Sequence, residues 1–172
     1  MALHKRLFLL LFTMCLINSG CLRYSFTGTS IPEGVNTIFI PFFPDQSNSG
    51  IGDLSDRLND VLLQRFVNES KLSLANNEQD ADAILTGQIV SYSNRPFSIG
   101  GNEQANQNQV QIQVRATFSY RMNAESEWEN KSFSGTFTFD PTDDPIEGED
   151  NAADEALEQI ANNMFNEAVS SW

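Results

Sequence analysis

Histidine and cysteine are almost absent from this sequence, and the few that occur all lie near its start. The one histidine is His4 and the two cysteines are Cys15 and Cys21, all within the first 21 of 172 residues. If the segment before Cys21 is removed, the mature chain keeps one thiol and no histidine. Catalysis by Ser-His-Asp or Cys-His arrangements, histidine-ligated metal sites and an intramolecular disulfide are then excluded.

Basic residues and long apolar runs are also scarce. Ten Lys and Arg stand against 23 Asp and Glu, which gives a formal net charge of −13. A mature chain with eight basic and 23 acidic residues would carry −15. We therefore expect no binding to nucleic acid or to anionic lipid surfaces by charge. The apolar run 7–17 has 11 residues, too few to span a bilayer, and no later run approaches about 18.

The first 20 residues have the pattern of a bacterial lipoprotein signal. A basic start and the apolar run are followed by two small residues directly before Cys21. We therefore predict that residues 1–20 are a signal peptide and that Cys21 is the lipid-attachment site. Asn18 departs from the pattern, because this position usually holds Leu or another aliphatic residue. The alternative is plain secretion with a free thiol at Cys21.

The mature chain divides into a short lead and one domain. Residues 21–34 are predicted to form an extended lead, in which Tyr24 and Phe26 are expected to pack on the edge of the fold; contact with a partner is the alternative. Residues 35–172 are predicted to form a single domain, since a mature chain of 152 residues is long enough to bury about 70% of its unfolded surface.

Apolar patterning predicts elements in the order β-α-β-β-β-α. A strand at 35–43 ends at prolines, and apolar spacings of three and four indicate an amphipathic helix at about 50–68. The other expected elements are a very short strand or link at 71–75, a strand at 84–92 with a bulge near Gly87, an antiparallel hairpin of strands at 109–120 and 128–140, and a closing helix at 153–172. The fold class is α+β, a mixed sheet of about four strands with both helices packed on one face.

The strand at 109–120 has the clearest pattern in the chain. Apolar residues alternate strictly with polar ones, which predicts one buried and one solvated face. Gln111, Gln113 and Arg115 on the solvated face are candidates for a contact surface. The alternative is that these side chains are simply hydrated.

Carboxylates are the remaining candidates for chemistry. Six acidic residues cluster between Asp140 and Asp150, but their spacing fits neither an EF-hand loop nor a glycosidase motif. We interpret the cluster as a solvated loop whose acids favour the positive end of the following helix, with weak divalent-ion binding as the alternative. We expect no enzymatic activity, no catalytic residue, no resident metal and no cofactor.

Several stretches together resemble one family. Residues 21–47 (CLRYSFTGTSIPEGVNTIFIPFFPDQS), the helix LSDRLNDVLLQRF, LTGQIVSYS, the alternating hairpin and the ending MFNEAVSSW are similar to the lipopolysaccharide-assembly lipoprotein (LptE) family in its Bacteroidetes-type form. The resemblance implies an outer-membrane protein, lipid-anchored and facing the periplasm, that assists the lipopolysaccharide-translocating β-barrel LptD and lipopolysaccharide delivery. Lipopolysaccharide itself is a second implied partner, although no basic ligand residue of the family is carried over to this acidic chain.

A second resemblance offers an alternative function. TIFIPFF, the following helix, KLSLA and DADAILTGQI are also similar to outer-membrane lipoproteins of the curli-secretion and penicillin-binding-protein-activator type. Those proteins form a secretion pore or activate a cell-wall synthase. The YSFTG stretch at 24–28 and the long hairpin before a terminal helix favour lipopolysaccharide assembly.

Overall fold

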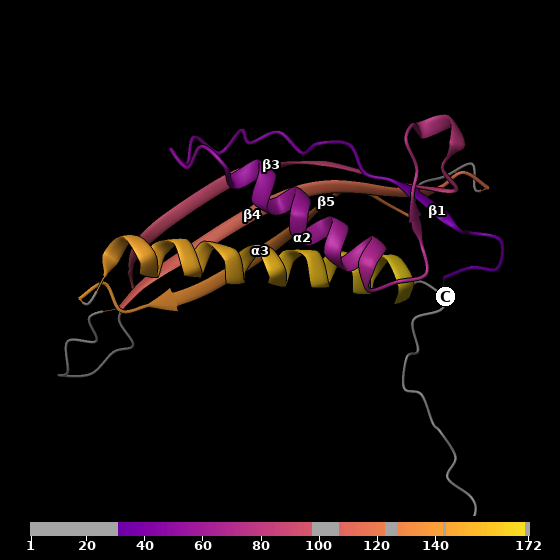
Figure 1. The fold of residues 1–172 in the computed structure, drawn as a ribbon. Helices are drawn as coiled ribbons and strands as arrows, with labels where there is room; N and C mark the ends of the chain where they lie inside the picture. Colours follow the sequence, from indigo (N-terminus) through magenta and orange to yellow (C-terminus); the bar gives the residue numbers. More distant parts are fainter. Residues whose placement is uncertain (1–30, 98–106, 123–126, 143, 171–172) are drawn as a thin grey trace, which may run out of the picture.

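One five-stranded mixed sheet and two helices form the fold (Figure 1). The computed structural model describes residues 31–97, 107–122, 127–142 and 144–170. The strand order is β2-β1-β3-β4-β5. The strands are β1 (Thr37–Phe39), β2 (Ser73–Leu74), β3 (Ala83–Phe97), β4 (Gln107–Tyr120) and β5 (Trp128–Phe139). The predicted α+β class is confirmed, with five strands where about four were expected.

The fifth strand is β2, which lies in the segment 71–75 that was predicted to be either a very short strand or a link. β2 has only two residues and pairs in parallel with β1, which also runs parallel to β3. A pair of this length has little sequence signal, because two residues show no periodicity. β1 is likewise shorter than predicted. The chain after it still follows β3, since the Ile89 N–H donates to the carbonyl of Pro44 and the Gln46 N–H to that of Ile89.

The three long strands β3, β4 and β5 pair antiparallel. The pairing of β4 with β5 confirms the predicted hairpin. β3 runs five residues beyond its expected end and carries a register shift between Ile89 and Ser91. The bulge is therefore at Val90 and not near Gly87. Gly87 serves a packing purpose, because a Cβ there would come within 2.5 Å of the Phe43 ring and 2.6 Å of the Arg115 carbonyl oxygen.

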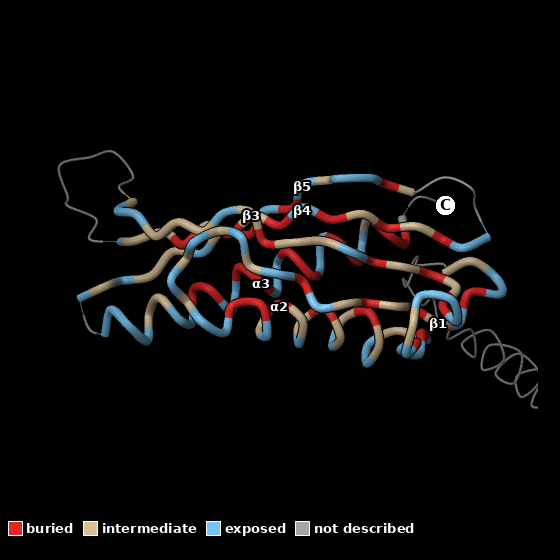
Figure 2. The backbone as a smooth tube through the Cα atoms, turned by 90° about the horizontal axis from the view of Figure 1, so that it is seen from above, coloured by how far each residue is buried: buried red, intermediate tan, exposed pale blue. Residues whose placement is uncertain are grey.

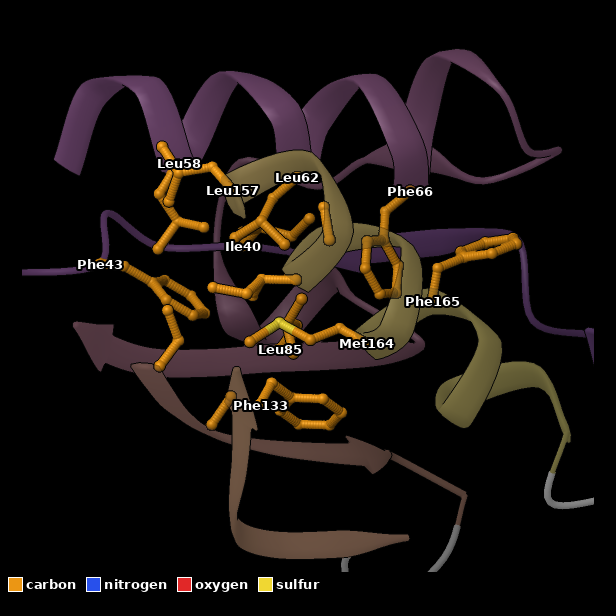
Figure 3. Packing of buried hydrophobic residues seen from close by; sticks show 14 of the residues in the cluster. Ile40, Phe43, Leu58, Leu62, Phe66, Leu85, Phe133, Leu157, Met164 and Phe165 are labelled. Carbon is orange, nitrogen blue, oxygen red and sulfur yellow. The ribbon is translucent and has the colours of Figure 1, made fainter. Parts of the chain in front are cut away.

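Both helices cover the same face of the sheet, as predicted (Figures 1 and 2). α2 spans Leu54–Leu63 and continues as a π-helical segment, η2, at Gln64–Asn68; a 3-10 turn, η3, spans Glu78–Asp80. Figure 3 shows the core between the layers, where helix side chains meet Leu85 of β3 and Phe133 of β5. The helical residues labelled there are Leu58, Leu62, Phe66, Leu157, Met164 and Phe165.

The closing helix α3, Pro145–Ser170, begins eight residues earlier than predicted. The proline-broken stretch was expected to be a loop, but Pro145 is in the first turn, where no intrahelical N–H is needed. The Asp144 carboxylate accepts the N–H groups of Ile146 at 3.1 Å and Glu147 at 3.0 Å, so it caps the helix. A proline and an acidic residue in this arrangement start a helix and do not exclude one.

Candidate functional site: the open face of the sheet

The face of the sheet opposite the helices is lined by polar side chains. Gln113 of β4 lies opposite Ser91 of β3 and Ser134 of β5, whereas the neighbouring Ile112 and Val114 are fully buried on the helix side. We call this surface the open face. It consists of Thr86, Gln88, Ser91, Ser93, Arg95, Gln109, Gln111, Gln113, Arg115, Thr117, Ser132, Ser134, Thr136 and Thr138. None of these residues is buried.

The open face contains the three candidate contact residues named from the sequence. The structure places Gln111, Gln113 and Arg115 along the middle strand, flanked by hydroxyl groups of β3 and β5. Arg95 of β3 reaches across and donates from Nη2 to Gln111 Oε1 at 3.0 Å. The sequence pattern of β4 did not identify Arg95, because only the register between two strands brings it beside Gln111.

Charge is segregated between the two layers. The open face has two cations, Arg95 and Arg115, and no carboxylate. α3 in the opposite layer has seven acidic residues and no basic residue: Glu147, Glu149, Asp150, Asp154, Glu155, Glu158 and Glu167. The open face is therefore a neutral to basic surface on an acidic protein, rich in amides and hydroxyls that both donate and accept hydrogen bonds.

Several acidic residues of the 140–150 cluster form contacts within the domain. Asp140 accepts from the backbone N–H and hydroxyl of Thr142, which lowers its pKa, and Glu149 accepts from the Tyr92 hydroxyl at 2.5 Å. Burial, that hydrogen bond and the charge of Glu149 raise the pKa of Tyr92. Among the residues described, no three His, Cys, Asp or Glu side chains are grouped as metal ligands. Asp143 lies outside them.

A pocket of about 260 Å³ lies where η2 meets α3. Three of its polar residues pair with one another, since Arg65 Nη1 contacts Glu69 Oε2 at 2.6 Å and Gln64 Nε2 donates to Glu69 Oε1 at 3.2 Å. The Arg65 guanidinium also lies 4.9 Å from the centroid of the Phe165 ring. The lining residues are Val61, Gln64, Arg65, Glu69, Glu158, Ala161 and Asn162. Nothing in this lining matches a nucleophile–base pair or a cofactor cradle.

The predicted lipid-attachment residue Cys21 and the aromatic residues Tyr24 and Phe26 lie outside the described residues. Their roles remain predictions. Within the part of the chain that is described, no helix has the length and apolar character needed to cross a membrane.

Comparison with known proteins gives one family and a shared fold. The family described as lipopolysaccharide-assembly, LptE, matches residues 35–168. No match was found among the curated proteins. Lipoprotein B from Nitrosomonas europaea is 13% identical, with a TM-score of 0.52 over 79% of this chain and 83% of that one. A lipoprotein from Caulobacter crescentus is 12% identical, with a TM-score of 0.51 over 77% and 88%. At this identity, the two structures establish the fold alone.

Proposed function

Because the chain belongs to the LptE family of lipopolysaccharide-assembly proteins, whose match covers residues 35–168, we propose that it assists LptD, the lipopolysaccharide-translocating β-barrel of the outer membrane. In this role it helps the barrel fold and takes part in lipopolysaccharide delivery. The family match carries the proposal. It favours lipopolysaccharide assembly over the curli-secretion and wall-synthase-activator alternative.

The proposal places the protein on the periplasmic side of the outer membrane. Cys21 carries the lipid anchor, and residues 22–34 connect it to the domain. Two or three acyl chains hold a protein on a membrane much more firmly than one chain does, at about 0.8 kcal/mol per buried methylene.

The role is one of binding and not of catalysis. The mature chain has no histidine. Three acidic side chains of the 140–150 cluster form structural contacts: Glu149 with Tyr92, Asp150 with Arg57, and Asp144 with the start of α3. The LptE family is a family of non-catalytic lipoproteins. A stable two-layer domain with one unpartnered polar face supports a scaffold that docks on another protein.

The open face is the surface that meets the barrel in this proposal. Polar hydroxyl and amide groups fit the hydrated inner wall of a large β-barrel, whose lumen is polar. Arg95 and Arg115 would pair with carboxylates of that wall. These two arginines are the only cations of the open face, so the proposal includes no lipopolysaccharide-binding residue.

Affinity purification of the detergent-solubilised, lipidated protein tests the proposal. One very large outer-membrane β-barrel is expected as the dominant partner. Arg115→Glu should lower its recovery roughly tenfold, because a like-charge contact costs more than 1 kcal/mol. Lys71→Glu is the matched control, since it reverses an exposed cation away from the open face. Recovery of a peptidoglycan synthase or a homo-oligomeric ring instead of the barrel would overturn the proposal.

A further inference from the structure

One margin of the sheet is a long strand with a free outer edge. β5 has 12 residues and is the last strand in the order, whereas β2 at the other margin has two. Figure 2 shows β5 along one side of the molecule. Within the described ranges, no strand pairs with its outer edge. Such an edge presents unpaired N–H and C=O groups to other chains, and proteins usually block it.

The first four residues of β5 are blocked in the usual ways. The ladder with β4 shifts register between Ala116 and Phe118, and Asn130 adopts a positive φ of 48°. Lys131 forms an ion pair with Glu167 of α3. A bulge and a charged side chain both prevent a further strand from pairing here.

The remaining eight residues of β5, Ser132–Phe139, have none of these features. It contains no charge, no proline and no register shift, and its sequence SFSGTFTF is rich in β-forming residues. The distal half of β3 differs, because it carries Arg95 and Pro96. We call Ser132–Phe139 the β5 edge segment.

A side chain from α3 already occupies one outward backbone group of this segment. The Thr136 N–H donates to Gln159 Oε1 at 3.0 Å, so it points away from β4. Alternate residues of an antiparallel strand point their N–H groups to the same side. Since the register is regular here, the N–H groups of Ser134 and Thr138 also point outward. They are two residues from Thr136 on either side, at the spacing that an added strand uses.

Apolar surface and charge indicate which kind of strand fits. Phe137, within this segment, is 42% exposed. Glu155 and Asn163 lie one helical turn on either side of Gln159 and are both exposed. A second copy of the chain would bring another α3 with seven acidic and no basic residues toward the first, and like charges repel. A strand that carries Lys or Arg is attracted instead.

We propose that the β5 edge segment is a docking site for an extended segment of a partner protein, which extends the sheet by one strand. The added strand hydrogen-bonds to the backbone of Ser134 and Thr138 and displaces Gln159 from Thr136. On its helix side it places an apolar residue against Phe137 and a Lys or Arg near Glu155. Main-chain bonds of this kind provide affinity, and the side-chain positions provide specificity. This proposal does not depend on the partner being LptD.

Hydrogen exchange of the full-length, lipidated protein tests the site. The amides of Ser134 and Thr138 are compared in the isolated protein and in the complex purified from membranes under mild detergent. We expect both amides to exchange at least about tenfold more slowly in the complex, because they gain hydrogen bonds. Unchanged exchange at both amides would overturn the proposal, even if the barrel is present. Protection in a complex without the barrel would support the docking site and contradict the proposed function.

Substitutions provide an independent readout. Ser134→Pro removes an outward N–H without touching the ladder to β4, whereas Ser134→Ala keeps the N–H and is the matched control. The Ser134→Pro variant should lose the bound partner protein, and the Ser134→Ala variant should keep it. If Ser134→Pro does not fold, Phe137→Lys blocks the same edge by charge and should also release it. If a folded Ser134→Pro or Phe137→Lys variant still binds the partner protein, the docking site is overturned. It is also overturned if sedimentation shows a concentration-dependent homodimer and the Ser134 and Thr138 amides are protected in that homodimer.

Discussion

At the scale of single residues, Arg57 of α2 connects the two helices. Its guanidinium donates from Nε to Asp154 Oδ1 at 2.7 Å and from Nη2 to the Asp150 carbonyl oxygen at 2.7 Å. The side chain is only 17% exposed, so these bonds are partly shielded from water. Arginine suits this position because its planar group presents several donors at fixed angles.

Arg57→Gln should destabilise the fold by about 1–3 kcal/mol, because it removes charge-assisted hydrogen bonds and takes the shared cation away from three carboxylates. The midpoint of urea unfolding measures the loss. Arg115→Gln is the matched control, since Arg115 is exposed on the open face, and should shift stability by less than about 0.5 kcal/mol. Equal effects of the two variants would contradict the role of Arg57.

Asp82 is a second residue that joins distant segments. Its Oδ2 accepts the backbone N–H of Asn36 at 3.0 Å, the hydroxyl of Thr37 at 2.9 Å and the N–H of Thr37 at 3.1 Å. These donors, with Arg121 nearby, hold the pKa of Asp82 below its ordinary value of 3.8. The carboxylate therefore fixes the start of β1 against β3 in its charged form.

The depressed pKa predicts how stability depends on pH. Between the folded and unfolded pKa values the unfolded state binds more protons, so the contribution of Asp82 is complete above about pH 4 and is lost as pH falls through the folded pKa. Asp82→Asn should flatten the acid limb of a plot of unfolding midpoint against pH. Thr37→Val, which removes one of the donors, should flatten it partly. An acid limb identical to wild type in Asp82→Asn would contradict this assignment.

At the scale of elements, α3 packs very closely against β5. A Cβ on Gly135 would lie 1.9 Å from the Ala156 carbonyl oxygen, which is backbone and cannot rotate away. The helix therefore packs directly on the strand at this position. The same close approach lets Gln159, one turn further along α3, reach the edge of β5.

Gly135→Ala should force α3 away from β5. Overpacking in a core typically costs about 1–3 kcal/mol, and we expect the upper end here because the clash is with backbone. Thermal unfolding measures the loss. Gly52→Ala is the matched control, since a Cβ at Gly52 meets nothing within 4 Å and its φ is not positive, so this variant should unfold close to the wild-type temperature. A Gly135→Ala variant as stable as the control would show that α3 does not pack so closely.

At the scale of the whole molecule, charge and attachment act together. The helix layer is acidic, and the open face has only arginines among its ionisable groups. A protein with net charge −13 is repelled by an anionic lipid surface, so attraction to lipid headgroups does not explain membrane binding. Covalent acylation at Cys21 fills that role in the proposed function.

Cys21→Ser should release the protein into the periplasmic fraction, because the acyl anchor is lost. Membrane fractionation followed by immunoblotting measures the distribution in cells lacking the barrel partner. Cys15→Ser is the matched control and should leave the protein with the outer membrane, since Cys15 lies inside the predicted signal. If the Cys21→Ser variant still fractionates with the outer membrane in those cells, Cys21 is not the anchor.

Several features could be read from the sequence because each depends on local periodicity. The alternation at 109–120 predicted both faces of β4, including Gln111, Gln113 and Arg115, and the spacing of apolar residues predicted the two helices. The predicted start of α3 was wrong, because Pro145 was interpreted as a helix break and not as a residue of the first turn. Periodicity cannot distinguish these roles, because a proline ends one helix and begins another by the same fixed geometry.

The sequence by itself determined the α+β class, the dry and wet faces of the long strand and the acidic charge. Only the tertiary structure decided which residues meet across the sheet, such as Arg95 with Gln111. It also decided that β5 lies at the margin of the described sheet and that Gln159 reaches its outer edge. Strand order and register arise from contacts between residues far apart in the chain, and a single sequence carries no local signal of such contacts.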